Sequence, residues 1–138
     1  MKYVLRFDTE FVYDSTLEGI TIDVELSLDP RLQPVRVRAK VDTGASDCLF
    51  RRIYADLLGL AVESGERRTF LTAAGSILAY GHEVTIRVLD TECTSTVYFF
   101  ADDAVRRNLL GRRGWLDRVR LGIVDYESTL YLSAFHEA

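Results

Sequence analysis

The sequence predicts an all-β fold. Four segments of the 138-residue chain alternate apolar and polar residues, as strands with one buried face do: 20–28 (ITIDVELSL), 35–41 (VRVRAKV), 82–89 (HEVTIRVL) and 95–101 (STVYFFA). Hydrophobic residues make up 48% of the chain and charged residues 28%, which is enough apolar material for one core without disulfides or metal. A second complete domain would not fit this length.

The connections between these segments carry turn and helix signals. Pro30 and Pro34 lie in DPRLQP between the first two strands, so this segment predicts a turn and the two strands a hairpin. Residues 51–60 have apolar residues at helical spacing and predict one or two helical turns that end at Gly59. A second short helix is predicted at 112–119, where apolar residues fall on one side and charged residues on the other.

Both ends of the chain complete the β prediction. Residues 120–126 (RLGIVDY) and 129–135 (TLYLSAF) read as the final two strands. Residues 1–19 are predicted to be an N-terminal β arm or extension, and residues 20–138 to be the single domain.

Composition narrows the function classes. The net charge of −4 disfavours a nucleic-acid partner, and the basic stretch RRNLLGRR (106–113) is interpreted as a solvated face. Because no segment has the length of a membrane span or the pattern of a signal peptide, we expect a cytoplasmic protein without membrane contact.

The cysteines and histidines give no pattern of a metal site or a disulfide framework. Cys48 and Cys93 are expected to be reduced, with Cys48 a buried small hydrophobe and not a nucleophile. His82 and His136 lack a partner at metal-ligand spacing, so surface or structural roles are expected for them, and no metal is predicted.

One carboxylate stands at an unusual place. Asp42-Thr43-Gly44 directly follows the strand 35–41, and Ala45 and Ser46 after it are small enough to allow a tight, accessible loop. A carboxylate beside a buried strand is costly unless something uses or satisfies it. Taken alone, the motif also fits an Asp-Gly turn in which Asp42 caps backbone amides.

Two further motifs follow in order. Residues 70–86 (FLTAAGSILAYGHEVTI) have a hairpin pattern with small residues at the tip, and residues 108–112 (NLLGR) lead into the second predicted helix. VDTGAS, this hairpin and NLLGR together resemble the retropepsin-like aspartic proteases over most of residues 20–132. The resemblance implies an acid-protease barrel with one flap hairpin and one or two short helices.

The resemblance also implies a mechanism. Asp42 would be one half of a catalytic dyad, and because the chain has a single Asp-Thr-Gly, the site would be completed by a second copy in a homodimer. Two carboxylates in contact would share a proton, so that one activates a water and the other donates toward the scissile carbonyl of a peptide or protein substrate. No cofactor is implied.

The remaining site residues follow from the same resemblance. Thr43, Gly44 and Ala45 would support the active-site loop. The substrate-binding residues would be Gly44, Ser46 and Asp47 together with the flap tip Ala73, Ala74, Gly75 and Ser76. The structural motif before the C-terminal helix would be Asn108, Leu109, Leu110, Gly111 and Arg112.

The sequence departs from the retroviral pattern at Ser46, where those enzymes carry an acidic residue that pairs with the arginine of the GR sequence. Arg112 is therefore expected either to reach Asp47 or to pair with nothing. Two rival interpretations stay open: a catalytically inactive retropepsin-fold module for dimerisation or peptide binding, and an unrelated β-barrel in which Asp42 only caps a turn.

Overall fold

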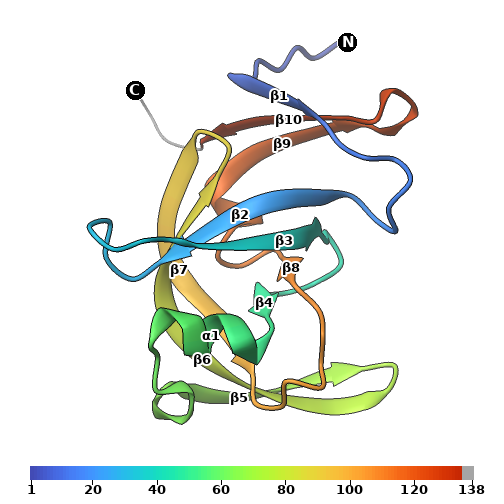
Figure 1. Cartoon of the computed structure of the whole chain (residues 1–138). Coiled ribbons are helices and arrows are strands. Elements are labelled where there is room, and N and C mark those ends of the chain that lie inside the picture. The colour runs from blue at the N-terminus through green and yellow to red at the C-terminus, as the bar shows by residue number, and fades with distance from the viewer. Residues whose placement is uncertain (135–138) are drawn as a thin grey trace.

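A computed structural model describes residues 1–134 and shows the predicted all-β fold, built from two sheets (Figure 1). The larger sheet has seven strands in the order β2 (Thr21–Ser27), β3 (Val35–Val41), β8 (Leu109–Leu110), β4 (Leu49–Phe50), β7 (Thr91–Phe100), β6 (Gly75–Val88) and β5 (Glu66–Thr72). Strand β2 also pairs with β6, so six of these strands close into a barrel and β5 extends from its edge.

The smaller sheet lies at one end of the barrel and contains β1 (Thr9–Val12), β10 (Thr129–Ala134) and β9 (Val119–Val124) in that order. Strands β9 and β10 form the predicted final hairpin, joined by the 3-10 turn η3 (Asp125–Glu127). The last residue of the predicted strand, Phe135, and also His136 lie outside the described residues. Strand β1 pairs with β10, which attaches the N-terminal segment to the chain end.

A side-chain hydrogen bond reinforces this attachment. The Tyr13 hydroxyl, just beyond β1, donates to Oδ1 of Asp125. This hydrogen bond, together with burial, raises the pKa of Tyr13 to about 12. The N-terminal segment is therefore held at both β1 and Tyr13.

The predicted strands are present, and two are longer than their sequence signal. The hairpin of β2 and β3 is confirmed, with Leu26 opposite Val35 beside the turn. The predicted strand 82–89 is the second half of β6, and the predicted strand 95–101 is the second half of β7. Side chains of β3 alternate as predicted, since Val37, Ala39 and Val41 are buried.

The helical predictions are partly confirmed. Helix α1 (Arg52–Leu58) ends at Gly59, whose φ of 79° is the left-handed C-cap conformation. The 3-10 turn η1 (Val62–Ser64) follows.

No helix within residues 1–134 is long and apolar enough to cross a membrane.

The predicted helix 112–119 is wrong in extent, because only the 3-10 turn η2 (Leu116–Arg118) forms there. Arg113 pairs with Asp47 in a parallel β-bridge, so the backbone there follows a strand and not a helix. Gly114 has a φ of 102°, which breaks the helical path before η2 begins.

Two hydrophobic clusters fill the interior. The main core occupies the barrel and includes the fully buried Trp115 and Phe99. A smaller cluster lies beneath the β5–β6 hairpin and contains Leu49, Ala79, Tyr98 and Phe100, with Phe70, Ile77, Val105 and Leu109 packed against it. The smaller cluster therefore supports the hairpin from below.

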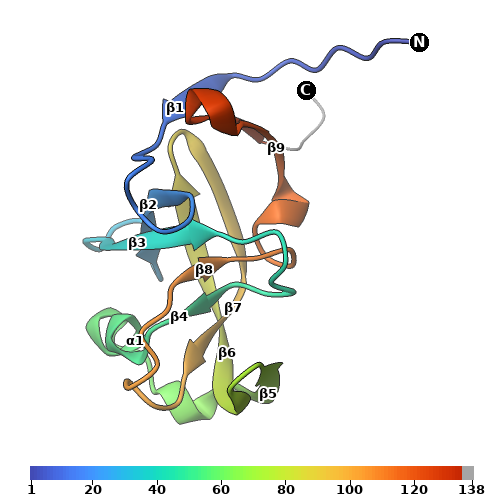
Figure 2. The ribbon, with the colours of Figure 1, turned by 90° about the vertical axis from the view of Figure 1, so that its right-hand side faces the viewer.

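Strand β8 lies between β3 and β4, as Figure 2 shows. It runs parallel to β3 and antiparallel to β4, with Leu109 opposite both Lys40 and Leu49. A strand of two residues has no alternation to detect, so the sequence did not predict it. Its pairing therefore connects β3, which precedes residues 42–48, to β4, which follows them.

Gly111 follows β8 and is required by close packing. A Cβ atom at this position would lie 2.1 Å from the carbonyl oxygen of Asp47 and 2.9 Å from that of Ala45. Both atoms belong to backbone, which is also fixed by the hydrogen bonds from Arg112 and Arg113, so it cannot move aside without losing them.

Substitution Gly111→Ala is expected to lower the free energy of unfolding by about 3 kcal/mol, because the methyl group overpacks a backbone contact. Denaturant titration of the purified variant measures this loss.

The matched control is Gly122→Ala on β9, where the three atoms nearest to the added Cβ all belong to the ring of Phe7, and this ring can rotate away. We expect a change within about 0.5 kcal/mol for this control. Equal stability of the Gly111 variant and the unmodified chain would contradict the packing role of Gly111.

Candidate active site

Asp42 is the first residue after β3. Its backbone N–H donates to the carbonyl of Leu110 at 3.0 Å, and its carbonyl accepts from Ala45 N–H at 3.2 Å. One carboxylate oxygen, Oδ1, accepts the N–H of Gly44 at 2.9 Å. Asp42 is half-buried. Its carboxylate is thus held by its own loop and still reaches solvent.

The rest of the Asp-Thr-Gly loop is open. Thr43, Gly44 and Ser46 are exposed, while Ala45 is half-buried. No Cβ clash restricts Gly44, whose nearest neighbour would be Asp42 Oδ1 at 3.3 Å. The loop therefore presents its tip to whatever binds at this face.

Asn108 fixes the loop from the other side. Its side-chain oxygen accepts the N–H of Arg51 at 3.0 Å, and its amide nitrogen donates to the carbonyl of Arg38 at 3.3 Å. Its backbone carbonyl accepts the N–H of Lys40 at 2.8 Å. Asn108 thus connects β3 to Arg51, which lies between β4 and α1, and this explains the asparagine of NLLGR physically.

Asp47 is buried, with 3% of its surface exposed. Its Oδ1 lies 3.3 Å from Nη1 of Arg68 on β5 and 3.5 Å from Nε of Arg113. Its Oδ2 accepts the hydroxyl of Ser46 at 2.8 Å. Of the two alternatives expected for Arg112, the second holds: Arg68 and Arg113 contact Asp47, and Arg112 forms no ion pair within residues 1–134.

Arg68 is enclosed by aromatic rings as well as by Asp47. Its guanidinium carbon lies 4.8 Å from the ring centroid of Phe70 and 5.2 Å from that of Tyr98. The hydrogen bond with the Tyr98 hydroxyl, together with the nearby Asp47 carboxylate, raises the pKa of Arg68. Sequence reasoning missed Arg68, although its place two residues before Phe70 puts both side chains on the inner face of β5.

The hairpin of β5 and β6 has the predicted small-residue tip. Ala73 and Ala74 form the turn, while Gly75 and Ser76 are the first residues of β6. The hydroxyl of Thr72 donates to Gly75 O at 2.9 Å and accepts from Ala74 N–H at 3.2 Å. Gly75 has a φ of 115°, a backbone conformation that residues with a side chain rarely adopt.

Two open grooves border these elements. One, of about 560 Å³, is lined by Glu18, Thr21, Arg38, Lys40, Asp42, Arg106, Arg107, Asn108 and Leu109. The other, of about 340 Å³, is lined by the hairpin tip (Thr72–Ala74), Ile77 and the segment Ala104–Arg107. Because Arg106 and Arg107 line both grooves, Asp42 and the hairpin tip lie on one continuous face.

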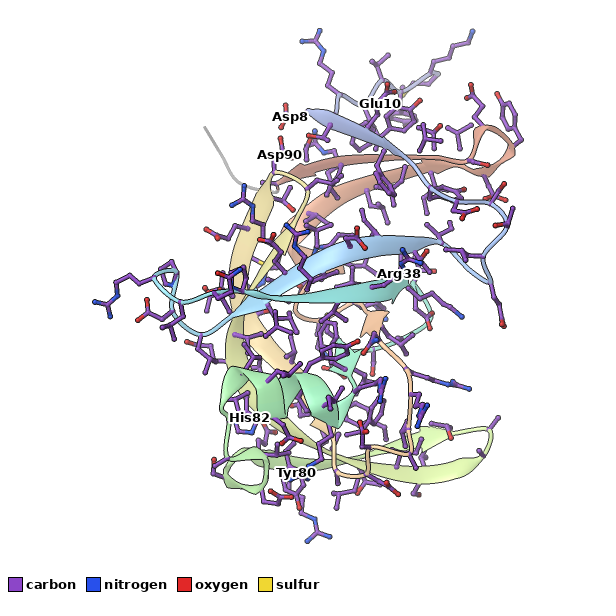
Figure 3. All side chains as sticks on the ribbon, viewed as in Figure 1. Asp8, Glu10, Arg38, Tyr80, His82 and Asp90 are labelled. Carbon is purple, nitrogen blue, oxygen red and sulfur yellow. The ribbon has the colours of Figure 1, made fainter. Side chains whose placement is uncertain are left out.

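The other sequence candidates have structural roles. Cys48 is fully buried, and burial raises its pKa to about 12, which agrees with the prediction that it is no nucleophile. His82 lies beside η1 (Figure 3), with Nε2 2.8 Å from the carbonyl of Val62. Within residues 1–134, no group of His, Cys, Asp and Glu side chains could hold a metal ion.

Comparison with known proteins places this geometry in a family. A family model described as aspartyl protease matches residues 22–114, which is more than half of the chain and includes Asp42 and the NLLGR motif. No curated protein matches the chain.

Two solved structures share the fold. A retropepsin-like aspartic protease from Rickettsia conorii is 21% identical, with a TM-score of 0.64, and the match covers 91% of this chain and 97% of that one. The EIAV protease in complex with an inhibitor is 16% identical, with a TM-score of 0.56, and the match covers 73% of this chain and 88% of that one. The chain therefore belongs to the aspartyl protease family, and its fold is that of the retropepsin-like proteases.

Proposed function

We propose that the protein is an aspartic endopeptidase that works as a homodimer, with Asp42 from each chain forming the catalytic pair. The observation that carries this proposal is the position of Asp42, whose half-buried carboxylate stands at the head of an exposed loop in a chain of the aspartyl protease family. Both ends of that loop are hydrogen-bonded to the NLLGR segment.

A second copy completes the site in this proposal. A two-fold axis brings the same residue of both chains together, so one Asp-Thr-Gly motif supplies two carboxylates. The exposed Thr43 lies next to Asp42 and would hydrogen-bond across the axis. Gly44 leaves room for the approach of the partner loop or the substrate backbone, because a glycine carries no side chain.

The chemistry then needs one proton on the pair. Two adjacent carboxylates cannot both ionise easily, so one is ionised and the other protonated. The ionised carboxylate takes a proton from a water that attacks the scissile carbonyl, and the protonated one donates to the developing oxyanion. The carboxylate that took the water proton then gives it to the leaving amine as the C–N bond breaks. A hydroxyl of the tetrahedral intermediate returns a proton to the other carboxylate, so the pair again holds one proton.

The surrounding residues take different roles. Gly44 and Ser46 are exposed beside Asp42 and would contact the peptide, while the hairpin tip from Ala73 to Ser76 would close over it. Asp47 was expected to bind substrate, but its carboxylate is enclosed by Arg68, Arg113 and Ser46. We therefore assign Asp47 to positioning the loop against β5.

Substitution Asp42→Asn is expected to lower kcat/KM for peptide cleavage by about 10²- to 10⁴-fold, because an amide can act neither as base nor as acid. The side-chain oxygen of asparagine still accepts the Gly44 amide, so the turn and the fold should persist. Mass spectrometry of a digested peptide library measures cleavage, and thermal denaturation checks the fold.

Asp29→Asn is the matched control. Asp29 Oδ1 accepts the N–H of Arg31 at 2.9 Å, the same turn geometry and distance as at Asp42, but at the opposite end of β3. This variant should cleave as well as the unmodified chain. Undiminished cleavage by the Asp42 variant would show that Asp42 only caps a turn, as in the rival interpretation.

Dimerisation makes a separate prediction. When unmodified chains are mixed with a ninefold excess of Asp42→Asn chains and allowed to exchange, cleavage should fall about tenfold, because most unmodified chains then pair with an inactive one. The matched control is a ninefold excess of bovine serum albumin. Unchanged activity in the mixture, with a monomer in sedimentation at high concentration, would contradict the shared site.

A further inference from the structure

Basic side chains surround Asp42, although the whole chain carries a net charge of −4. The groove that contains Asp42 has only one other acidic residue in its lining, Glu18. Its basic lining residues are Arg38, Lys40, Arg106 and Arg107. The local charge is therefore opposite in sign to that of the whole molecule.

The fold gathers these residues from two segments. Even-numbered residues of β3 point away from the core, so Arg38, Lys40 and Asp42 share one face of the strand line. Arg38 projects from β3 in Figure 3. The hydrogen bonds of Asn108 to Arg38 O and Lys40 N bring Arg106 and Arg107, which immediately precede it, against this same face.

Most of these cations have no carboxylate partner among the residues that the structure describes. Arg38 has a long contact with Asp23, 3.9 Å between Nε and Oδ1, while Lys40, Arg106 and Arg107 form no ion pair within residues 1–134. Arg51 and Arg68, by contrast, pair with carboxylates at 3.3 Å. The groove beside Asp42 thus gathers several positive charges that no carboxylate of the described residues neutralises at close range.

The groove lining favours a peptide over a nucleic acid. Single-stranded nucleic acid is usually bound by aromatic side chains on which bases stack, in addition to basic residues. The two grooves are lined without a single Phe, Tyr, Trp or His. Positive charge without a stacking surface is suited to carboxylate side chains.

We propose that the natural substrate is an acidic peptide segment, with Asp or Glu next to the scissile bond, held by Lys40, Arg106 and Arg107. This inference rests on the proposed protease function, because it places the scissile bond at Asp42. By the two-fold symmetry of the dimer, each half of the peptide meets one copy of the groove, so acidic residues are favoured on both sides of the bond.

The test compares two decapeptide libraries that differ only in charge, one with Asp and Glu at the varied positions and the other with Asn and Gln. The acidic library should have a kcat/KM about tenfold higher, the effect of two or three exposed ion pairs. The ratio should fall as NaCl is raised, because salt screens such pairs. Equal cleavage of both libraries would overturn the inference.

The double variant Arg106→Gln/Arg107→Gln should bring the ratio close to one. The matched control is Arg36→Gln/Arg87→Gln, which removes the same charge from a groove of about 430 Å³ that lacks Asp42. The control should keep the full ratio. A ratio unchanged in the Arg106/Arg107 variant would also overturn the inference.

A binding measurement separates this inference from the proposed function. Fluorescein-labelled acidic and amide decapeptides are titrated with the Asp42→Asn chain, and polarisation should show tighter binding of the acidic peptide. If this preference is found but the unmodified chain cleaves neither library, the protease proposal fails and the groove inference stands. If both libraries are instead cleaved at the same rate and cleavage depends on Asp42, the groove inference fails and the protease proposal stands.

An oligonucleotide competitor tests the remaining alternative. A single-stranded DNA decamer should displace the labelled acidic peptide only at concentrations well above those of the unlabelled acidic peptide. Displacement at equal or lower concentration would show a general polyanion site and would overturn the assignment to acidic peptides.

Discussion

The insertion of β8 between β3 and β4 is the constraint on which the rest of the site depends. The loop that carries Asp42 begins at the end of one of these strands and returns into the other, so without a strand between them its two limbs would be joined only at the tip. Backbone hydrogen bonds from both limbs to residues 108–113 close this gap. Gly111 makes the arrangement possible because only a residue without a side chain fits against the carbonyls of Ala45 and Asp47.

This constraint explains how the β-barrel accommodates the carboxylate of Asp42. The backbone of Asp42 is fully engaged, with its N–H bonded to Leu110 and its carbonyl to Ala45, and Oδ1 accepts the Gly44 amide. Desolvation is thus compensated by hydrogen bonds while part of the carboxylate stays accessible. Asp47, five residues later, is instead closed off from solvent, because its carboxylate contacts two arginines and a serine. Two acids of one loop are therefore suited to different tasks by their surroundings.

The sequence was informative where periodicity or a motif extends over several residues. Alternation predicted β2, β3 and the second halves of β6 and β7, and Gly59 correctly marked the end of α1. Strands β4 and β8 escaped detection because their two residues carry no period, and their pairing partners are distant in sequence. The helix at 112–119 was overestimated because Arg113 pairs with the distant Asp47 in a β-bridge and Gly114 has a positive φ. Asp42 could be singled out from its motif, whereas Arg68 could not be linked to Asp47, since only the folded hairpin brings residues 21 positions apart together.

The contact between Arg68 and Asp47 also sets the mechanics of the β5–β6 hairpin. Arg68 ties β5 to the loop that carries Asp42, and its stacking on Tyr98 ties it to β7 as well. Only Thr69–Thr72 of β5 extend beyond this anchor before the turn, a lever of about 13 Å at the usual rise per residue. Bending beyond the anchor would move the tip across the groove while leaving Asp42 in place. In the proposed protease, the length of this lever would set how thick a chain the hairpin could cover.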